Sequence, residues 1–380
     1  MMEEWSLSTI GEVCVLRSGT TLPKEIEKPA GEIPYLKVAD MNLGDNLNGI
    51  TSSSRYVNKN DVNASNLLPV GTTIFPKRGG AILTNKKRLT ERVICADLNI
   101  MGVTPKARLL PEYVFYYFLN LDLGEICNGT SIPQINNYTI EPLLISFPKA
   151  LPEQQRIVTI LDEAFDGIAT AKAKAEKNLQ NARALFESHL QSVFTQRGGG
   201  WVAIALENCC AKILAGGDVP KGRVSEERTP QYSVPIYSNG AKNEGLYGFT
   251  DVANVMKPSV TISARGTIGF SAIRTEPFLP VVRLIILVPD EETIDLSFLH
   301  YAVMGMDFEN TGTSIPQLTV PNLRERLIYI PTLTQQRVIV ANLDAIRDET
   351  QRLEAIYRQK LAALNALKKS LLDQAFTGAL

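Results

Sequence analysis

Two stretches of the chain carry apolar side chains at steps of three and four residues, which places them on one face of an α-helix. The first lies within residues 151–197 and the second within residues 333–380. Each stretch has a proline near its start and a glycine near its end, which are common boundary signals of a helix. The apolar faces are narrow seams of the kind that pack in coiled coils. We therefore predict two long helices, and the alanine-rich seam of the first favours close packing against the larger side chains of the second.

The segments before the two helices have a different pattern. Short apolar runs rich in β-branched residues alternate with glycine, proline and asparagine, as in strands joined by turns. The clearest predicted strands cover residues 33–38, 72–75, 260–263 and 281–288. Short helices are predicted near residues 111–121 and 296–306. The predicted fold class is α+β, with two mixed α/β globular domains at residues 1–150 and 198–332.

The two halves of the chain repeat the same motifs in the same order. The sequence Gly-Thr-Ser-Ile-Pro-Gln occurs at residues 129–134 and again at residues 312–317, and a Gln-Gln-Arg run opens each helical stretch. A repeat of this length indicates two related domains, each followed by its own helix. Chain order then predicts that the helices separate the two domains and pack antiparallel about an approximate two-fold axis. It also predicts that the chain ends near its start.

The repeated Gly-Thr-Ser-Ile-Pro-Gln segment allows two interpretations. Its hydroxyl groups could donate hydrogen bonds to phosphate. The favoured interpretation is a turn that joins each domain to its helix, with Ile132 and Ile315 buried. The Gln-Gln-Arg run is interpreted similarly, as a capping and packing element at the start of each helix.

Composition limits the classes of protein to which the chain can belong. Of its 380 residues 44% are hydrophobic, and the formal net charge is −1. No apolar run reaches the ~18 residues of a membrane span, and the acidic start does not resemble a signal peptide, so we expect a cytoplasmic protein. The five cysteines form no Cys-x-x-Cys pair and the two histidines are far apart, so no zinc site is expected. Any nucleic-acid contact must come from a local basic surface.

Known catalytic motifs are missing from the sequence. It contains no Gly-x-x-x-x-Gly-Lys-Ser/Thr loop, no His-Glu-x-x-His pair and no Gly-x-Ser-x-Gly elbow. It has no Pro-Pro dipeptide, and so lacks the Asp/Asn-Pro-Pro-Tyr motif with which amino-methyltransferases hold a target base. We expect a chain without a catalytic centre or bound cofactor of its own. A self-contained nuclease or methyltransferase is the less favoured alternative.

The main candidate for a binding function is a basic segment between residues 75 and 93. It contains one acid and six basic residues: Lys77, Arg78, Lys86, Lys87, Arg88 and Arg92. Basic side chains beside glycines could contact a DNA backbone or groove edge, and an ordinary solvated hairpin is an equally good interpretation. Arg265-Gly266 matches Arg78-Gly79, since each pair follows a predicted strand. The weaker candidates are Arg17, Lys221, Arg223, Lys257, Arg274 and Arg283.

On these motifs the chain resembles the specificity (S) subunits of type I restriction-modification enzymes. The resemblance is carried by Trp5 with the Ile-Gly-Glu-Val run that follows it, by Gly-Thr-Ser-Ile-Pro-Gln, and by Leu-Pro-Glu-Gln-Gln-Arg-Ile-Val at residues 151–158. Residues 262–269 also resemble the family, and the second half repeats the order of the motifs. The resemblance covers nearly the whole chain.

The resemblance implies that each globular domain is a target recognition domain for one half of a split double-stranded DNA site, with the helical pair setting the gap. It implies a non-catalytic subunit that recruits two modification (M) subunits, which carry S-adenosylmethionine and methylate adenine. In the full complex, two restriction (R) subunits use ATP and Mg²⁺. Candidate partner contacts are Gln154, Arg156, Gln335 and Arg337. The nearest alternative is the specificity subunit of a fused type IIB-like enzyme, and a coiled-coil scaffold without DNA contact is another.

Overall fold

The computed structural model describes residues 5–47, 49–129, 132–308 and 318–380. The chain forms two compact units. Unit 1 consists of residues 1–175 and 359–380, and unit 2 of residues 176–358. The two long helices, α5 (Leu151–Thr195) and α9 (Leu333–Thr377), each contribute residues to both units.

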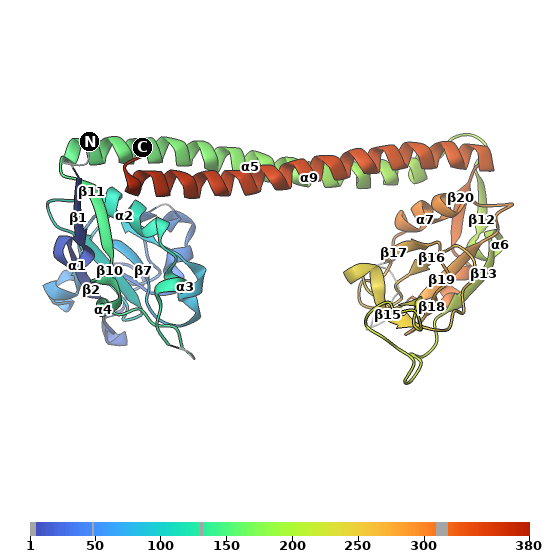
Figure 1. Ribbon diagram of the computed structural model, residues 1–380, viewed down its shortest axis with the longest axis horizontal. Coiled ribbons are helices and arrows are strands. Elements are labelled where there is room, and N and C mark those ends of the chain that lie inside the picture. The colour runs from blue at the N-terminus through green and yellow to red at the C-terminus, as the bar shows by residue number, and fades with distance from the viewer. Residues whose placement is uncertain (1–4, 48, 130–131, 309–317) are drawn as a thin grey trace. The chain divides into compact units, whose positions relative to one another are not determined.

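Unit 1 is a mixed α/β domain with short elements (Figure 1). Its strands are β1 (Trp5–Thr9), β2 (Cys14–Ser18), β3 (Ile33–Leu36), β4 (Gly49–Ile50), β5 (Tyr56–Val57), β6 (Leu67–Leu68), β7 (Thr73–Pro76), β8 (Arg88–Thr90), β9 (Ile94–Ala96), β10 (Ile100–Pro105) and β11 (Leu144–Pro148). Its short α-helices are α1 (Ile10–Val13), α2 (Pro111–Asn120), α3 (Leu123–Ile126) and α4 (Asn137–Ile140). Its 3-10 helices are η2 (Lys24–Ile26), η3 (Val38–Asn42), η4 (Gly44–Asn46), η5 (Lys59–Asp61), η6 (Ala64–Asn66) and η7 (Gly79–Thr84).

Among the described residues, unit 2 has fewer strands and 3-10 helices than unit 1, in a similar order. Its strands are β12 (Val202–Ala205), β13 (Cys210–Ala215), β14 (Val234–Tyr237), β15 (Leu246–Thr250), β16 (Ser259–Ile262), β17 (Ser271–Arg274), β18 (Leu279–Pro280), β19 (Ile285–Pro289) and β20 (Leu327–Ile330). Its short helices are α6 (Leu206–Cys209), η8 (Lys242–Gly245), α7 (Leu296–Met304) and α8 (Val320–Arg324).

Sheet topology shows that the two units are structural repeats. In unit 1 the largest sheet has the order β2-β10-β7-β8-β4, and in unit 2 the corresponding sheet has the order β13-β19-β16-β17. A second sheet, β5-β3-β9-β6, corresponds to β15-β14-β18, and the pair β1-β11 corresponds to β12-β20. The predicted α+β class, with two related mixed domains and two long helices, is confirmed.

Most of the elements expected from the sequence are found, with one exception. The helix expected near residues 111–121 is α2, and that expected near residues 296–306 is α7. The single strand predicted over residues 281–288 is wrong, because a turn separates β18 from β19. No glycine, proline or asparagine marks this turn in the sequence.

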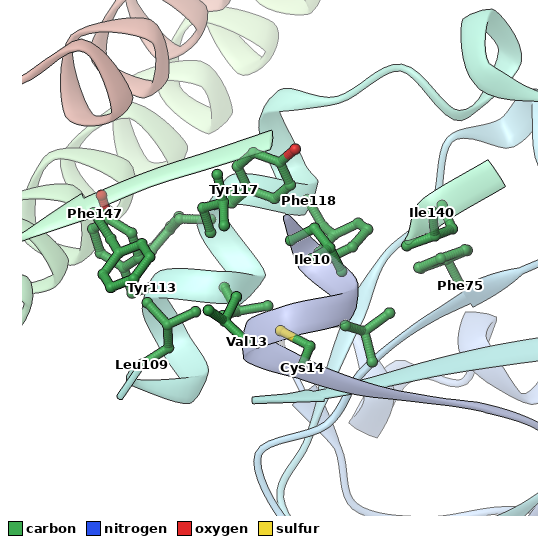
Figure 2. Packing of buried hydrophobic residues seen from close by; sticks show 14 of the residues in the cluster. Ile10, Val13, Cys14, Phe75, Leu109, Tyr113, Tyr117, Phe118, Ile140 and Phe147 are labelled. Atoms are coloured by element: carbon green, nitrogen blue, oxygen red, sulfur yellow. The ribbon is translucent and has the colours of Figure 1, made fainter. Parts of the chain in front are cut away.

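The core of unit 1 lies between its largest sheet and the long helices (Figure 2). The aromatic residues of α2 fill this layer: Phe118 stacks on Phe75 with ring centroids 5.4 Å apart, and Tyr113 meets Phe376 of α9 edge-on at 5.1 Å. A fully buried side chain of this size contributes about 1.5–3 kcal/mol to folding through the hydrophobic effect. The Tyr113 hydroxyl also donates to the Ser146 carbonyl at 2.9 Å, which ties α2 to β11.

The long helices pack antiparallel within each unit. In unit 1 the early residues of α5 meet the late residues of α9: the Arg156 guanidinium donates to the Leu380 carbonyl at 2.8 Å, and Lys172 bonds Asn365. In unit 2 Arg183 pairs with Glu354 at 3.2 Å. The predicted antiparallel packing is confirmed.

A buried glutamine anchors the start of each long helix to its domain. In unit 1 the Gln154 amide accepts from the Leu110 N–H at 2.9 Å and donates to the carbonyls of Arg108 and Pro148 at 3.0 and 2.8 Å. In unit 2 Gln336 makes the equivalent bonds, accepting from the Asp295 N–H at 2.8 Å and donating to the carbonyls of Thr293 and Pro331 at 3.1 and 2.9 Å. Both glutamines are fully buried.

These anchors correct the alignment of the two Gln-Gln-Arg runs. By contacts, Gln154 corresponds to Gln336, so the sequence register that pairs Gln154 with Gln335 is off by one residue. A second repeated contact supports the corrected register, because Tyr116 bonds Asp162 in unit 1 and Tyr301 bonds Asp344 in unit 2.

The two ends of the chain meet within unit 1, as predicted. A side chain at Gly378 would lie 3.4 Å from the indole of Trp5, so the end of α9 packs against β1. The equivalent tryptophan of unit 2, Trp201, packs edge-on against Phe194 near the end of α5, with ring centroids 6.2 Å apart.

In each unit one strand leads toward the helix anchor and begins at the other end of the domain. The end of β10 leads to Arg108 and Leu110, which bond Gln154, and the end of β19 leads to Thr293 and Asp295, which bond Gln336. The loops at the start of β10 and of β19 therefore lie away from the long helices, as Figure 1 shows for each unit.

Replacing Gln154 with alanine should destabilise unit 1. The change leaves the Leu110 N–H and the carbonyls of Arg108 and Pro148 without this partner, and an unsatisfied buried polar group costs about 1–3 kcal/mol. We expect Gln154→Ala to lower the free energy of unfolding in chemical denaturation by at least this amount. The control is Gln155→Ala, because that neighbouring side chain is exposed. Equal effects of the two variants would contradict the anchor.

Candidate nucleic-acid interface

Several strand ends of unit 1 meet at one place. Register pairs Ser18 at the end of β2 with Met101, and Pro76 at the end of β7 with Ile100, so β2 and β7 both end beside the start of β10. The strands β3 and β9 run parallel and end at the same level. The loops that follow β2, β3, β7 and β9 form what we call the loop end of unit 1.

Three of the sequence candidates lie at this loop end. The Lys77 ammonium donates to the Ser18 hydroxyl at 2.6 Å, and its pKa is lowered by partial burial and by the neighbouring Arg78. The side chain of Arg78 is exposed. Arg17, on β2, is exposed and donates to the Leu67 carbonyl at 3.0 Å. The fold thus brings Arg17, near the end of β2, and Lys77-Arg78, after β7, to the same end of the domain.

The remainder of the basic segment does not form a hairpin beside them. It begins with η7, and the three basic residues after η7 are tied to neighbouring elements. Lys86 bonds the Asn42 side chain, and the Arg88 Nε donates to the Asn46 carbonyl at 2.7 Å. Partial burial lowers the pKa of Arg88. These two side chains hold η3 and η4 to β8.

Lys87 is a correction to the sequence prediction. Its side chain is only 2% exposed, and its ammonium donates to the Asn85 side chain at 2.5 Å and to the Leu121 carbonyl at 2.6 Å. Burial lowers its pKa to about 8. Because the ammonium is enclosed and already bonded, Lys87 supports the fold and does not reach a ligand at the surface.

The sequence prediction also grouped Arg92 with Arg78, and the structure separates them. Strand β8 runs antiparallel to β7, so its far end at Thr90 lies at the opposite end of the sheet from Arg78. The Arg92 guanidinium there donates to the carbonyl of Glu32 at 3.0 Å. Arg92 and Arg78 therefore do not belong to one continuous surface.

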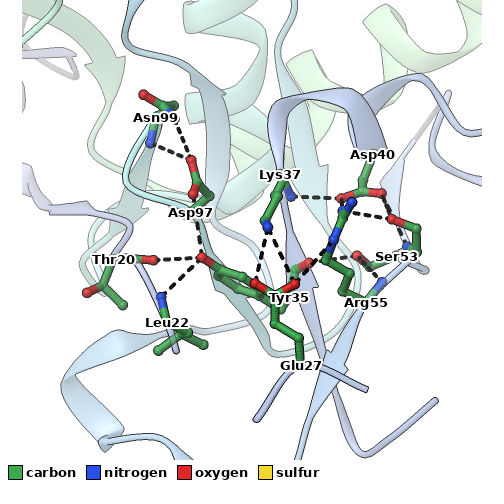
Figure 3. Close-up of polar contacts among 11 residues, drawn as sticks. Thr20, Leu22, Glu27, Tyr35, Lys37, Asp40, Ser53, Arg55, Asp97 and Asn99 are labelled. Atoms are coloured by element: carbon green, nitrogen blue, oxygen red, sulfur yellow. Dashed lines mark hydrogen bonds and ion pairs between the residues drawn. The ribbon is translucent and has the colours of Figure 1, made fainter. Parts of the chain in front are cut away.

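The loop end of unit 1 also contains charged residues that the sequence analysis missed (Figure 3). The Glu27 carboxylate pairs with Lys37 at 3.1 Å and with Arg55 at 3.3 Å, and Arg55 also reaches Asp40 at 3.5 Å. These residues come from three separate loops. Because no run of sequence contains them together, no local signal could have identified the group.

A buried tyrosine fixes the turn between β9 and β10 to this network. The Tyr35 hydroxyl donates to the Thr20 carbonyl at 3.1 Å and lies 3.4 Å from the Asp97 carboxylate. Burial raises the pKa of Tyr35 to about 12. Asp97 in turn accepts from the Asn99 amide group at 2.7 Å, which orients Asn99 at the turn.

Unit 2 has an equivalent loop end. Ala215 at the end of β13 and Ile262 at the end of β16 are both opposite Ile285, the first residue of β19, while β14 and β18 run parallel and end together. Arg265 lies in the loop after β16 and is exposed.

The match between Arg78-Gly79 and Arg265-Gly266 is confirmed by the backbone. Both glycines have a φ of +72°. The residue before each arginine accepts a backbone hydrogen bond from a later segment, Lys77 from Ile135 at 2.9 Å and Ala264 from Leu318 at 3.1 Å. The two arginines therefore occupy equivalent positions in the two units.

The other basic candidates of unit 2 have different environments. Lys221 and Arg223 are exposed in the loop after β13, and Arg223 pairs with Asp251 at 2.6 Å, which lowers the pKa of that carboxyl group. The prediction that Arg274 contacts DNA is corrected, because its side chain is buried. Its guanidinium carbon lies 3.7 Å from the centroid of the Tyr237 ring. Lys257 precedes β16 and so lies at the end of that strand away from Arg265.

The candidate partner contacts at the helix starts divide into two groups. The prediction that Gln154 contacts a partner is corrected, because its side chain is buried and bonded within unit 1. Arg156, Gln335 and Arg337 are exposed. Arg156 pairs with Glu153 at 2.8 Å, and Gln335 accepts from the Thr332 hydroxyl at 3.1 Å as a local cap.

The repeated Gly-Thr-Ser-Ile-Pro-Gln segment is described in part. Its second copy, including Ile315, lies outside the described residues, as do residues 130 and 131. In the first copy Ile132 is 63% exposed, so the expected burial is wrong. Pro133 accepts from the Gly79 N–H at 2.8 Å, which places the segment beside Arg78 at the loop end.

The parts of the chain that the structure describes contain no group of three or more His, Cys, Asp or Glu side chains that could hold a metal ion. Among the same residues, none of the helices combines the length and the apolar character needed to cross a membrane.

The structure thus places the chain in the class of internally duplicated proteins, with two α/β domains that each carry an exposed arginine at the loop end and a glutamine-anchored long helix. A model of the family described as "Type I restriction modification DNA specificity domain" matches residues 2–180 and 200–363. These matches cover most of the chain, once in each half. The chain therefore belongs to this family of DNA sequence-recognition subunits.

Individual relatives agree with this assignment. A "Putative type I specificity subunit" of Mycoplasma pneumoniae is 26% identical over 341 residues, covering 89% of this chain and 88% of the relative. A second from the same organism is 33% identical over 279 residues, covering 70% and 81%.

Solved structures show the same fold. The chain is similar, with a TM-score of 0.82 and 20% identity, to a chain from a study of complex assembly and conformational transition of the type I restriction-modification system, covering 99% of this chain and 98% of that one. It is similar with a TM-score of 0.64 and 21% identity to the HsdS subunit from Thermoanaerobacter tengcongensis, covering 99% and 97%.

The interior position of Lys87 predicts a specific pH dependence of stability. Its folded pKa of about 8 lies below its usual value of 10.5, so between these pH values the unfolded state binds more protons and stability rises with pH. The variant Lys87→Met lacks this contribution. We expect the free energy of unfolding of the wild type, minus that of the variant, to increase from pH 8 to pH 10 in urea titrations. A constant difference would contradict an enclosed ammonium.

Proposed function

We propose that each unit binds one half of a split double-stranded DNA site through its loop end. The observation that carries this proposal is the repetition of one scaffold with different side chains at the same places. Lys77-Arg78 of unit 1 stands where unit 2 has Ala264-Arg265, and the turn at Asp97–Asn99 stands where unit 2 has Val282 and Arg283. Two related domains that recognise different bases need a constant frame and variable contact residues.

The chemistry of the loop ends supports contact with DNA. Exposed arginine and lysine side chains bind phosphate oxygens and release counterions from the duplex. Arginine also pairs with the O6 and N7 atoms of guanine, and asparagine pairs with adenine, in the major groove. Arg78 and Arg265 supply exposed guanidinium groups at equivalent positions, and Lys221 and Arg17 add further charge at the two loop ends.

We further propose that the pair α5 and α9 sets the gap between the half-sites and provides docking surfaces for two methyltransferase subunits. Support comes from family membership and from the polar residues exposed at the two helix starts, Arg156 in one and Gln335 and Arg337 in the other. S-adenosylmethionine would be bound by the methyltransferase partners. ATP and Mg²⁺ would be bound by two restriction subunits where these are present.

Exchange of the outer part of unit 1 tests the half-site assignment. Replacing residues 14–105 by the corresponding segment of a relative keeps α2 and the Gln154 anchor and changes the loops that follow β2, β3, β7 and β9. We expect the assembled complex to recognise a new sequence in one half of its site and to keep the other half and the gap. The measurement is methylome sequencing of host cells that express the chimera. The reciprocal exchange of residues 210–289 should change only the other half. A change in both halves from one exchange would contradict the proposal.

Loss of the Arg78 charge should weaken the electrostatic part of binding. We expect Arg78→Ala in the assembled complex to lower DNA affinity and to reduce the slope of log K against log salt concentration by about one, because one phosphate contact is lost. The matched control is Arg92→Ala, which removes an arginine at the opposite end of the same sheet and should leave the slope unchanged. Equal slopes for the two variants would place the DNA elsewhere.

A further inference from the structure

The turn between β18 and β19 is strained at its two central residues. The Leu284 N–H donates to the Val281 carbonyl at 3.1 Å, which closes a β-turn, and both Val282 and Arg283 have positive φ, +54° and +66°. This is the type I′ geometry, for which asparagine and glycine are the usual residues. A β-branched valine in the left-handed region is an outlier. Such strain persists only where the surrounding structure imposes it, and it often marks a functional site.

Contacts from two neighbouring loops hold the turn in this shape. The Val282 and Arg283 N–H groups donate to the carbonyls of Gly217 and Gly216 at 2.8 and 3.2 Å. A Cβ on Gly216 would lie 2.6 Å from the backbone of Pro280, so the close approach of this loop requires glycine. The Asn239 amide donates to the Val282 carbonyl at 2.6 Å.

Asn239 links the strained turn to the arginine loop. Its side-chain oxygen accepts from the Ala264 N–H at 2.7 Å, directly before Arg265. One side chain therefore fixes the positions of the turn and of the loop after β16. Both segments lie at the loop end of unit 2, and Val282 is 44% exposed there.

The equivalent turn of unit 1 shares one backbone contact with the unit 2 turn but lacks its strain. The Gly19 N–H donates to the Ile100 carbonyl at 2.9 Å, as Gly216 does to Leu284 at 2.7 Å. Yet the described residues 97–99 of this turn have no positive φ. The fold therefore does not require strain at this place, and the strained form depends on contacts that only unit 2 makes within the described residues, from Gly216, Gly217 and Asn239.

We propose that Arg283 is a base-reading residue of unit 2, with Asn239 as its positioning residue. This inference depends on the proposed function of the loop ends. The Arg283 side chain is exposed, and no hydrogen bond or ion pair of its guanidinium is found within the described part of the chain. A phosphate contact tolerates a mobile side chain on a relaxed backbone, whereas bidentate pairing with the O6 and N7 atoms of guanine needs a fixed approach. The clamped turn supplies that fixed approach.

The variant Arg283→Gly separates a reading role from a structural one. Glycine adopts positive φ without strain, so the thermal unfolding midpoint should stay the same or rise. The probe is a library of random-sequence DNA duplexes, from which the assembled complex selects its site. We expect the wild type to favour guanine at one base pair of one half-site, and Arg283→Gly to lose that preference by about tenfold or more. Asn239→Ala should weaken the preference at the same base pair.

The matched control is Lys257→Ala, which removes a cation at the far end of β16 and should leave the selected sequence unchanged. Unchanged selection by Arg283→Gly would overturn the inference, and so would a uniform loss of affinity over all sequences, which indicates a phosphate contact. If the wild-type complex selected no sequence, the proposed function itself would fail. The two failures are therefore distinguishable.

Discussion

The attachment of each domain to its long helix depends on one buried amide side chain. Gln154 and Gln336 each make three hydrogen bonds to backbone groups, two of them in the segment that follows β10 or β19. A buried amide holds its position because each unsatisfied polar group in the interior costs free energy. The anchor fixes the direction of β10 or β19, and with it the end of the domain at which the loops gather.

This arrangement separates the constant part of each domain from its variable part. The residues near the helices repeat between the units, as in the pairs Tyr116–Asp162 and Tyr301–Asp344. The loop ends share backbone geometry, with Gly79 and Gly266 at the same φ, while the side chains around them differ. Such a division suits a family of DNA specificity subunits, because new sequences can be recognised by changing side chains that carry no part of the anchor.

The loop ends also use electrostatics in two ways. In unit 1 the cations Lys37 and Arg55 are paired with Glu27 and Asp40, so these charges order the loops. Arg78 lies at the same loop end and is exposed. In unit 2 the order comes from Asn239 and from close backbone contacts, at the expense of strain at Val282. The two units therefore reach ordered loop ends by different physical means on one topology.

The sequence by itself determined the duplication, the two long helices, their antiparallel packing and the equivalence of Arg78 with Arg265, because these features depend on periodicity and on repeated motifs. Only the tertiary structure decided which basic residues face solvent. Lys87 lies between Lys86 and Arg88 in sequence, yet it is buried, and Arg92 lies beyond the far end of β8. The turn at Val282–Arg283 could not be predicted from the sequence either, because contacts with Gly216, Gly217 and Asn239 impose its φ angles against the local preference of its residues. Burial and strain arise from contacts between residues distant in sequence, which a linear pattern does not contain.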